Sequence, residues 1–280
     1  MYKTILVHVD QTDKSIQRID AAARLACEYQ AHLVGAAMTG LSPFMFGGAS
    51  IDGSMPPIVF PVEELRAEAN RALDLFDKTA SERGVNRCER RLVDDEAGIG
   101  MSLQARYSDL VIISQSTPGE FLPRLRSDFP EYVVLNGCRP VLVLPHAGAR
   151  TDIGRCVTVA WNGSVQAQRA ITSAISLLKR ASRVDLVVFN PGQNDSGGVP
   201  VHGELAGADM ALYLARHGIT VEVTAAGAGD GDALLSFAAD KGADLIVMGA
   251  YGHSQFRELV LGGMTRTALA SSPVALWLSH

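Results

Sequence analysis

Near the C-terminus, glycines are spaced as they are in loops that bind phosphate. Asp244–Gly249 is a largely apolar run of strand length that ends in glycine, and Gly252 follows after two residues. Nine residues later, Gly262 and Gly263 open a helix-like segment that contains Thr265. A strand, a Gly-rich loop and a helix start allow backbone amides and the helix dipole to face an anion. The stretch therefore predicts a phosphate site, although glycines after a buried strand also serve as plain turns.

The spacing matches neither the Walker A pattern nor Gly-x-Gly-x-x-Gly. It resembles instead the nucleotide loop of the universal stress protein family, in which a glycine followed by Ser or Thr closes the motif. Gly263 stands at the closing position, so the hydroxyl that would contact a phosphate is missing there. Thr265, two residues on, is the nearest replacement. The resemblance covers nearly the whole chain as two copies, and its motif is clearer in the second.

Strand-like and helix-like segments alternate along the chain, and the pattern occurs twice. Lys3–Asp10 and Arg155–Asn162, for example, both predict a buried first strand. Near-continuous apolar strands that alternate with helices indicate a parallel sheet covered on both faces. The expected fold class is α/β, with two tandem doubly wound domains, each with a five-stranded parallel sheet and about four helices. We place these universal-stress-like domains at residues 1–147 and 153–280, joined by a small polar linker.

The last strand of each copy is apolar and would otherwise be an exposed edge. These strands are Val141–Leu144 and Val274–Leu278. Because exposed apolar edges favour pairing with another strand, we predict that the domains pack as an intramolecular pseudo-dimer through them. Whether two chains also form a homodimer is left open by the sequence.

In family members that bind ATP, the acid that ends the first strand and a residue of the second strand hold the adenosine, while the Gly loop holds the phosphates. The resemblance implies an equivalent site in the C-terminal domain. Its residues are Ala160, Trp161, Asn162 and Phe189 for the nucleoside, and Gly249, Tyr251, Gly252, Gly262, Gly263, Met264 and Thr265 for the phosphate loop. Asn162 replaces the usual acid, but an amide still forms hydrogen bonds with hydroxyls. Loss of one neutral hydrogen bond costs about 1 kcal/mol, so the departures would weaken binding without abolishing it.

The first half keeps an acid, Asp10, after its first strand but lacks the Gly loop. Ser114–Gly119 follows its fourth strand, and Ser127–Pro130 lies where the second Gly pair would be. Asp128 at a helix start would repel phosphate and compete for the same amides. We predict that this half binds no triphosphate and is a structural partner or a site for another ligand. The long apolar loop at 41–61 is expected to cover its crevice or a partner.

Composition and charge argue against several other classes. A formal net charge of −5 with dispersed Lys and Arg argues against a nucleic-acid-binding surface. The four cysteines lie far apart, and neither they nor the histidines have metal-ligand spacing, so no metal site or disulfide framework is expected. No signal peptide is evident, and no apolar run reaches the ~20 residues that a membrane span needs. We expect a soluble cytoplasmic protein that contacts no membrane.

These observations lead to two hypotheses of different classes. The first is a cytoplasmic stress-response protein that binds ATP or a related adenine nucleotide, with or without magnesium, in its C-terminal domain and acts as a sensor or regulator. No catalytic set is evident, so enzymatic activity would be at most slow ATP hydrolysis. The second is a nucleotide-independent interaction or small-molecule-binding protein with a degenerate pocket. A transferase or ligase of the related adenine-binding superfamily is disfavoured, because Asn162-Gly163-Ser164 matches its phosphate loop too briefly.

Overall fold

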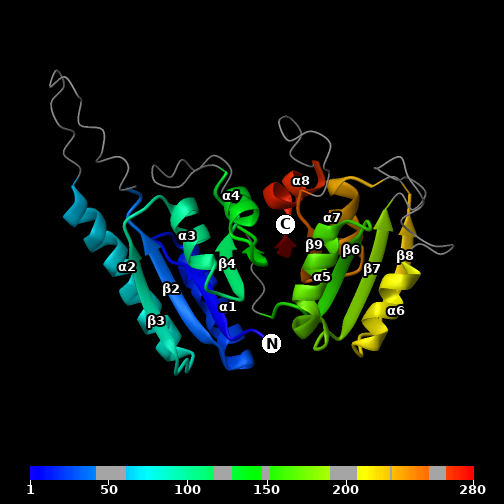
Figure 1. Ribbon diagram of the computed structural model, residues 1–280, viewed down its shortest axis with the longest axis horizontal. Helices are drawn as coiled ribbons and strands as arrows, with labels where there is room; N and C mark the ends of the chain where they lie inside the picture. The colour runs from blue at the N-terminus through cyan, green and yellow to red at the C-terminus, as the bar shows by residue number, and fades with distance from the viewer. Residues whose placement is uncertain (42–60, 117–127, 147–151, 190–206, 228, 252–262) are drawn as a thin grey trace, which may run out of the picture. The chain divides into compact units, whose positions relative to one another are not determined.

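The computed structural model describes two compact units, Met1–Gly137 and Cys138–His280 (Figure 1). The described residues are 1–41, 61–116, 128–146, 152–189, 207–227, 229–251 and 263–280. They form ten strands and eight helices that alternate along the chain, so the predicted α/β fold class is confirmed. A bilayer-spanning helix is absent from these residues, because each helix is too short or too polar to be one. Within the same ranges, no three His, Cys, Asp or Glu side chains come together as a metal site requires.

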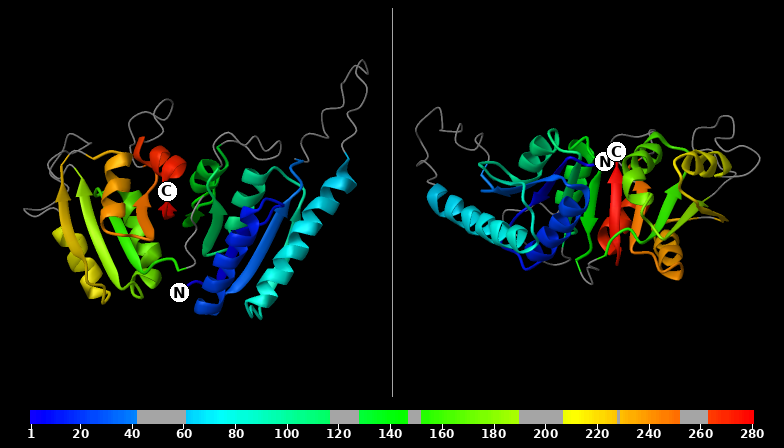
Figure 2. Two further views of the ribbon diagram at one scale, coloured as in Figure 1. Left: turned by 180° about the vertical axis from the view of Figure 1, so that it is seen from behind. Right: turned by 90° about the horizontal axis from the view of Figure 1, so that it is seen from below.

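The first unit is a parallel sheet flanked by helices. Its elements are β1 (Thr4–His8), α1 (Lys14–Tyr29), β2 (His32–Met38), α2 (Val62–Glu82), β3 (Cys88–Val93), α3 (Ala97–Ala105), β4 (Leu110–Ser114) and α4 (Phe129–Asn136). The strand order is β3-β2-β1-β4, so β1 is central, with β2 on one side and β4 on the other. α1 packs against α2, and α3 packs against α4. Figure 2 shows helices on both sides of these strands, as a doubly wound sheet requires.

The second unit repeats this plan and has two more strands, one of which is β5, the last strand of the first repeat. Its elements are β5 (Val141–Leu144), β6 (Cys156–Trp161), α5 (Val165–Leu178), β7 (Arg183–Phe189), α6 (Ala208–Arg216), β8 (Glu222–Ala226), α7 (Gly231–Asp240), β9 (Leu245–Gly249), α8 (Gly263–Ser271) and β10 (Ala275–Ser279). The order is β5-β10-β9-β6-β7-β8, and β5 alone is antiparallel to its neighbour β10, with Leu142 opposite Trp277. The predicted pairing of the last strands of the two repeats is therefore confirmed.

Helix starts follow from local sequence. α3 begins after Glu96, whose carboxylate accepts hydrogen bonds from the backbone N–H groups of Gly98 and Ile99. α7 begins after Asp230, whose carboxylate accepts from the backbone N–H of Ala233. In both cases the acid satisfies amides that have no partner inside the helix and complements the helix dipole.

A carboxylate before β9 fixes the start of the central strand β6. Asp244 is buried, and its two oxygens accept hydrogen bonds from the backbone N–H groups of Gly154–Cys156 at 2.6 to 3.0 Å. Asp109, just before β4, does the same in the first unit by accepting from the backbone N–H groups of Lys3 (2.7 Å) and Thr4 (3.0 Å). In each repeat, an aspartate therefore holds the start of the central strand against its neighbour in the sheet, β4 or β9.

The strand order of each unit reverses at its central strand. In the second unit, β7 and β8 lie on one side of β6, whereas β9 and β10 lie on the other. Ligands of open parallel sheets bind beyond the carboxyl ends of the strands at such a switch point. Asn162, Phe189 and Gly249 lie at or directly after the carboxyl ends of β6, β7 and β9, so the fold brings them to one edge.

Replacement of Asp244 by alanine should lower the free energy of unfolding by about 3 kcal/mol, because three backbone amides lose charge-assisted hydrogen bonds. Urea denaturation followed by circular dichroism measures this change. The matched control is Asp240→Ala, at the exposed end of α7, which should change stability by less than about 0.5 kcal/mol. Equal stability of the two variants would refute the anchoring role of Asp244.

Candidate functional site

Most residues of the predicted nucleotide site lie at the carboxyl edge of β6, β7 and β9. Those within the described residues are Ala160, Trp161, Asn162, Phe189, Gly249, Tyr251, Gly263, Met264 and Thr265, whereas Gly252 and Gly262 lie outside them. Ala160 is buried at the end of β6, and Asn162 is exposed in the turn that follows. Met264 is half-buried in the first turn of α8.

Gly249 has a packing role that the sequence did not indicate. A Cβ at this position would lie 2.6 Å from the carbonyl carbon of Gln166 and would also overlap the backbone nitrogen of Ala167. Both atoms belong to the first turn of α5. The glycine therefore lets α5 begin directly against the carboxyl end of β9.

Asn162 shapes the turn between β6 and α5. Its Oδ1 accepts hydrogen bonds from the backbone N–H (3.1 Å) and the hydroxyl (2.7 Å) of Ser164. The Ser164 hydroxyl oxygen in turn caps α5 by accepting from the backbone N–H of Ala167 at 3.1 Å. Because the oxygen of Asn162 is occupied, its Nδ2 is the group that can donate a hydrogen bond to a ligand hydroxyl.

Phe189 lies at the end of β7 against the turn that precedes α7. A Cβ on Gly229 would lie 2.7 Å from the Cβ of Phe189 and would overlap its ring, so the bare backbone of Gly229 covers part of this side chain. Phe189 is half-buried. The turn between β8 and α7 thus borders the position predicted for the adenine.

The loop after β9 is tied to α8 by a threonine. Tyr251 has φ +56°, in the left-handed region that non-glycine residues rarely adopt. Its backbone N–H donates to Oγ1 of Thr265 at 3.3 Å, and Thr265 is 3% exposed. The hydroxyl of Thr265 therefore already has a backbone partner, and only its proton is available to a second acceptor.

The first turns of α8 and α4 differ in charge and in the number of backbone amides. Gly263 begins α8 and is exposed, and a Cβ built on it would meet no atom within 4 Å. The first turn of α8 contains no acidic residue, so within the helix itself no negative side chain competes with an anion for the amides and the dipole. α4 instead follows Asp128, has Glu131 in its first turn, and lacks one amide at Pro130.

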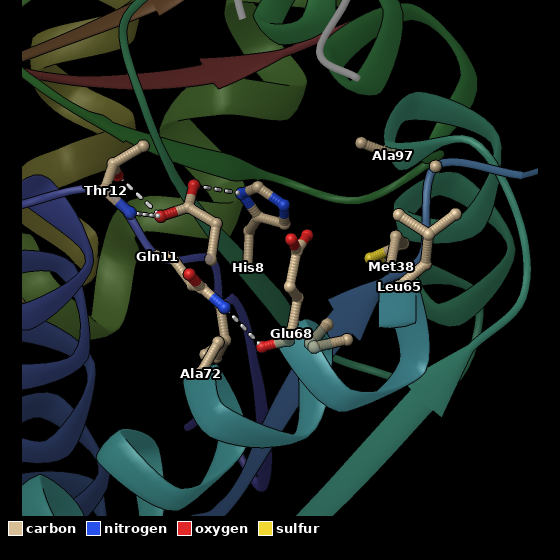
Figure 3. A pocket seen from close by; sticks show the side chains of 13 residues that line it. His8, Gln11, Thr12, Met38, Leu65, Glu68, Ala72 and Ala97 are labelled. Atoms are coloured by element: carbon tan, nitrogen blue, oxygen red, sulfur yellow. Dashed lines mark hydrogen bonds and ion pairs between the residues drawn. The ribbon is translucent and has the colours of Figure 1, made fainter. Parts of the chain in front are cut away.

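The first unit has a cavity of about 410 Å³ beyond the carboxyl ends of β1 and β2 (Figure 3). Its walls come from β1, β2, α2, the first residue of α3 and the turn after β1. The residues that shape it include His8 of β1 and Asp10 after it, Ala37 and Met38 of β2, and Leu65, Glu68, Ala69 and Ala72 of α2. Because Asp10 occupies the same place in its repeat as Asn162, the cavity corresponds to the position that was predicted for the nucleoside in the second unit.

A buried ionic cluster underlies this cavity. Arg18 of α1 is 2% exposed and places its guanidinium 2.9 Å from Oδ2 of Asp10. It also donates to the carbonyl oxygen of His8 (2.5 Å) and to the hydroxyl oxygen of Ser114 (3.0 Å). Asp10 Oδ1 accepts from the backbone N–H and the hydroxyl of Thr12, the same turn that Asn162 makes with Ser164. Asp10 is therefore held by protein groups on both oxygens.

The cluster shifts two pKa values downward. Burial alone would raise the pKa of Asp10, but the charge of Arg18, together with His8 and the hydrogen bonds from Thr12, outweighs burial and lowers it to about 2. Burial, and then the charge of Arg18, lowers the pKa of His8 to about 4 despite the nearby Asp10. At neutral pH the cluster therefore contains an ionised carboxylate, a guanidinium and a neutral imidazole.

Sequence analysis found Asp10 but missed His8 and Arg18. The available signal was the position of Arg18 on the apolar face of α1, beside Ile19 and Ala22, which are fully buried. Arginine is rarely buried without a partner, so an arginine on a buried helix face predicts a nearby acid.

Gly249→Ala should destabilise the protein by about 2–3 kcal/mol, because the added methyl group overlaps the backbone of α5, which cannot move away as a side chain can. Gly263→Ala is the matched control, since its methyl group enters open space and should change stability by less than about 0.5 kcal/mol. Urea denaturation of both variants tests the difference. If Gly249→Ala were as stable as Gly263→Ala, the close packing of α5 on β9 would be wrong.

Stability should fall as the pH is lowered through the range in which unfolded His8 becomes protonated. Because the pKa of folded His8 is about 4 against an ordinary 6.5, the unfolded chain binds more protons between these values. The contribution is fully present above about pH 6.5 and decreases toward pH 4, by up to about 3 kcal/mol in total. The lowered pKa of Asp10 extends the loss from about pH 3.8 toward pH 2.

The test is the dependence of unfolding free energy on pH between pH 7 and 4.5 for the wild type and for His8→Ala, the residue that the second repeat has at position 160. The variant should show the shallower dependence over this range, whatever its absolute stability. Parallel curves for the two proteins would contradict the lowered pKa of His8.

Both units are similar in fold to known proteins, and the second unit also matches a known family in sequence. A sequence model of the universal stress protein family matches residues 155–280. Along its length, the chain is similar to a universal stress protein from Archaeoglobus fulgidus DSM 4304, with 16% identity and a TM-score of 0.73 over 99% of this chain and 97% of that one. It is also similar to a functionally unknown protein from Pseudomonas aeruginosa PAO1, with 14% identity and a TM-score of 0.60 over 99% and 92%.

Single-domain structures match about half of the chain. One is a universal stress protein from Archaeoglobus fulgidus in complex with dAMP, with 16% identity and a TM-score of 0.35 over 51% of this chain and 97% of that one. No curated protein matches the chain at a significant level. The full-length matches show the fold of both halves, and the sequence model places the C-terminal half in its family. Residues 155–280 therefore belong to the universal stress protein family, and the chain along its length has a fold similar to that of a universal stress protein.

Proposed function

We propose that the C-terminal domain binds ATP or a related adenine nucleotide, and that the protein acts as a sensor or regulator in a stress response. The observation that carries this proposal is the open start of α8. Gly263 is exposed there without a side chain, and the first turn has no acid. ATP-binding members of the family hold phosphates at the equivalent loop, which supports the same role here.

Four described residues of the site have roles in this proposal that their positions and contacts allow. The Nδ2 of Asn162 would donate to a ribose hydroxyl, because its Oδ1 is already used by the turn. Phe189 would contact the base with the part of its side chain that Gly229 leaves uncovered. The amides of Gly263 and Met264 would bind phosphate oxygens, as amides at a helix start do.

The regulatory part of the proposal rests on family membership. Occupancy of the site would follow the nucleotide concentration relative to Kd. A ligand that binds only the folded state then stabilises it by RT ln(1 + [L]/Kd). Magnesium would accompany a triphosphate through the phosphate oxygens, since this ion commonly keeps several waters and binds substrate phosphates.

A second candidate is a nucleotide-independent interaction or small-molecule-binding protein. Two observations favour it. Packing of α5 suffices to explain Gly249, and Thr265 uses its hydroxyl oxygen to hold the backbone of Tyr251. Direct binding measurements separate the two candidates.

Calorimetric titration of ATP, with and without magnesium, should detect binding to the wild type and a loss of at least about tenfold in Gly263→Asp, because an acid at this helix start repels phosphate and competes for the amides. Gly263→Ser restores the family hydroxyl and should tighten binding about fivefold through one added hydrogen bond. Both side chains enter open space, so unfolding temperatures without nucleotide serve as the folding control. Absence of binding by ATP, ADP and AMP, together with no nucleotide in the purified protein, would replace this proposal with the second candidate.

A further inference from the structure

A buried histidine lines the cavity of the first unit, and its two ring nitrogens have different surroundings. His8 is 4% exposed, and its Nδ1 lies 3.5 Å from Oδ2 of Asp10. Its ring contacts that of Phe129, with centroids 4.9 Å apart. Among the residues that the structure describes, no hydrogen-bond partner for its Nε2 is found. Nε2 is therefore the group of His8 that is left for a molecule in the cavity.

The protonation of this histidine follows from its neighbours. The pKa of Asp10 is lowered to about 2, so its carboxylate is ionised and can only accept a hydrogen bond. The Nδ1 of His8 that faces it therefore carries the ring proton. Burial, and then the charge of Arg18, lowers the pKa of His8 to about 4, so the ring is neutral at physiological pH and Nε2 has a lone pair.

This lone pair gives the cavity a preference for ligands that contain a hydrogen-bond donor. A ligand with an O–H or N–H group at this place would give Nε2 a partner. A ligand of the same shape without a donor would exclude water from Nε2 and leave it unpaired in a buried place. Sites with a buried polar group of this kind discriminate strongly against an analogue that lacks the matching group.

The wall formed by α2 is apolar and low in relief. Leu65, Ala69 and Ala72 are spaced by four and then three residues, so they lie on one face of the helix, and all three are buried. Figure 3 shows Leu65 and Met38 across the space from the His8 ring. Short side chains next to a thioether suit the face and edge of an aromatic ring, because methionine sulfur makes favourable contacts with aromatic rings.

The cavity has the size and the fixed walls of a small-molecule site. Its volume of about 410 Å³ falls in the usual range for such pockets, which is roughly 300–1,000 Å³. The side-chain amide nitrogen of Gln11, in the turn after β1, donates to the backbone carbonyl oxygen of Glu68 at 2.7 Å. This hydrogen bond joins the turn to α2, so the spacing between the two walls is set before a ligand enters.

We propose that the first unit binds a flat aromatic alcohol, whose hydroxyl group donates a hydrogen bond to Nε2 of His8 and whose ring packs between α2 and Met38. An aromatic hydroxyl is a stronger donor than an aliphatic one, as the pKa of about 10 of the tyrosine phenol shows. The inference goes beyond the nucleotide proposal, because His8 stands where the second repeat has Ala160, which has no acceptor in its side chain.

The experiment is a titration of the full-length protein with 2-naphthol and with 2-methoxynaphthalene, followed by saturation-transfer NMR. The two probes share a fused ring, but only 2-naphthol has a hydrogen to donate. 2-Naphthol should bind at least about tenfold more tightly, because the methyl ether leaves Nε2 unpaired. Equal affinity for the two probes, or no binding of 2-naphthol, would overturn the proposal.

A pair of leucine variants on α2 places the binding in this cavity. Ala69→Leu fills part of the space and should weaken 2-naphthol binding at least about tenfold. Ala67→Leu is the matched control, since residue 67 is exposed on the same helix and the variant should bind as the wild type does. Thermal unfolding without ligand confirms that both variants are folded. Unchanged affinity in Ala69→Leu would show that the probe binds elsewhere and would refute the site.

His8→Phe tests the acceptor directly. It keeps a ring against Phe129 and removes both nitrogens, so 2-naphthol should lose about tenfold in affinity while the methyl ether keeps its affinity. A preference for 2-naphthol that persists in this variant would contradict the role of Nε2. Should the variant fail to fold, the two probes and the leucine pair still decide the proposal.

Adenosine is the competing ligand class, because the cavity corresponds to the position predicted for the nucleoside in the other repeat. It should displace 2-naphthol only at concentrations well above those at which 2-naphthol itself binds. Displacement at lower concentrations would replace the aromatic alcohol with a nucleoside. Neither naphthalene probe has a phosphate and all variants lie in the first unit, so failure here leaves the nucleotide proposal untouched.

Discussion

The position of each central strand depends on a carboxylate at the opposite edge from the candidate sites. Asp109 and Asp244 hold the backbone amides at the amino ends of β1 and β6. Successive side chains on a strand face opposite sides, so a slip of one residue would exchange the residues that face the core with those that do not. The same slip would move Asp10 and Asn162 away from the switch point. The functional edges are therefore set by hydrogen bonds a full strand length away.

From this shared framework the two repeats diverge at two places. At the end of the central strand, His8 with its partner Arg18 in one unit corresponds to Ala160 in the other. At the helix that follows the fourth strand, Asp128 and Pro130 correspond to the exposed start of α8 at Gly263. Both changes alter charge and hydrogen-bond donors while leaving the sheet intact. These differences between the repeats lie at the carboxyl end of the central strand and at the start of a helix.

Much of this architecture could be read from the sequence, because it rests on local signals. Alternating apolar strands and helices gave the α/β class and the repeat, and apolar last strands gave the pairing of β5 with β10. The reason for Gly249 could not be read, because it depends on where α5 begins against β9 in space. Likewise, one hydrogen-bond partner of the buried Arg18, Ser114, is far away in the chain and could not be assigned from the sequence. The apolar helix face around Arg18 indicates that this arginine is buried, but only the fold shows that Ser114 is among its partners.

The two strands of the antiparallel pair β5 and β10 are synthesised at very different times. β5 is made before the strands of the second repeat, and its partner β10 is made after them. While the intervening chain emerges from the ribosome, the apolar strand Val141–Leu144 has no β10 to pair with. Contacts between such distant segments form late and carry a high entropic cost. The apolar edge of β5 therefore stays without this partner until the second repeat has been made, and unpaired apolar edges favour aggregation.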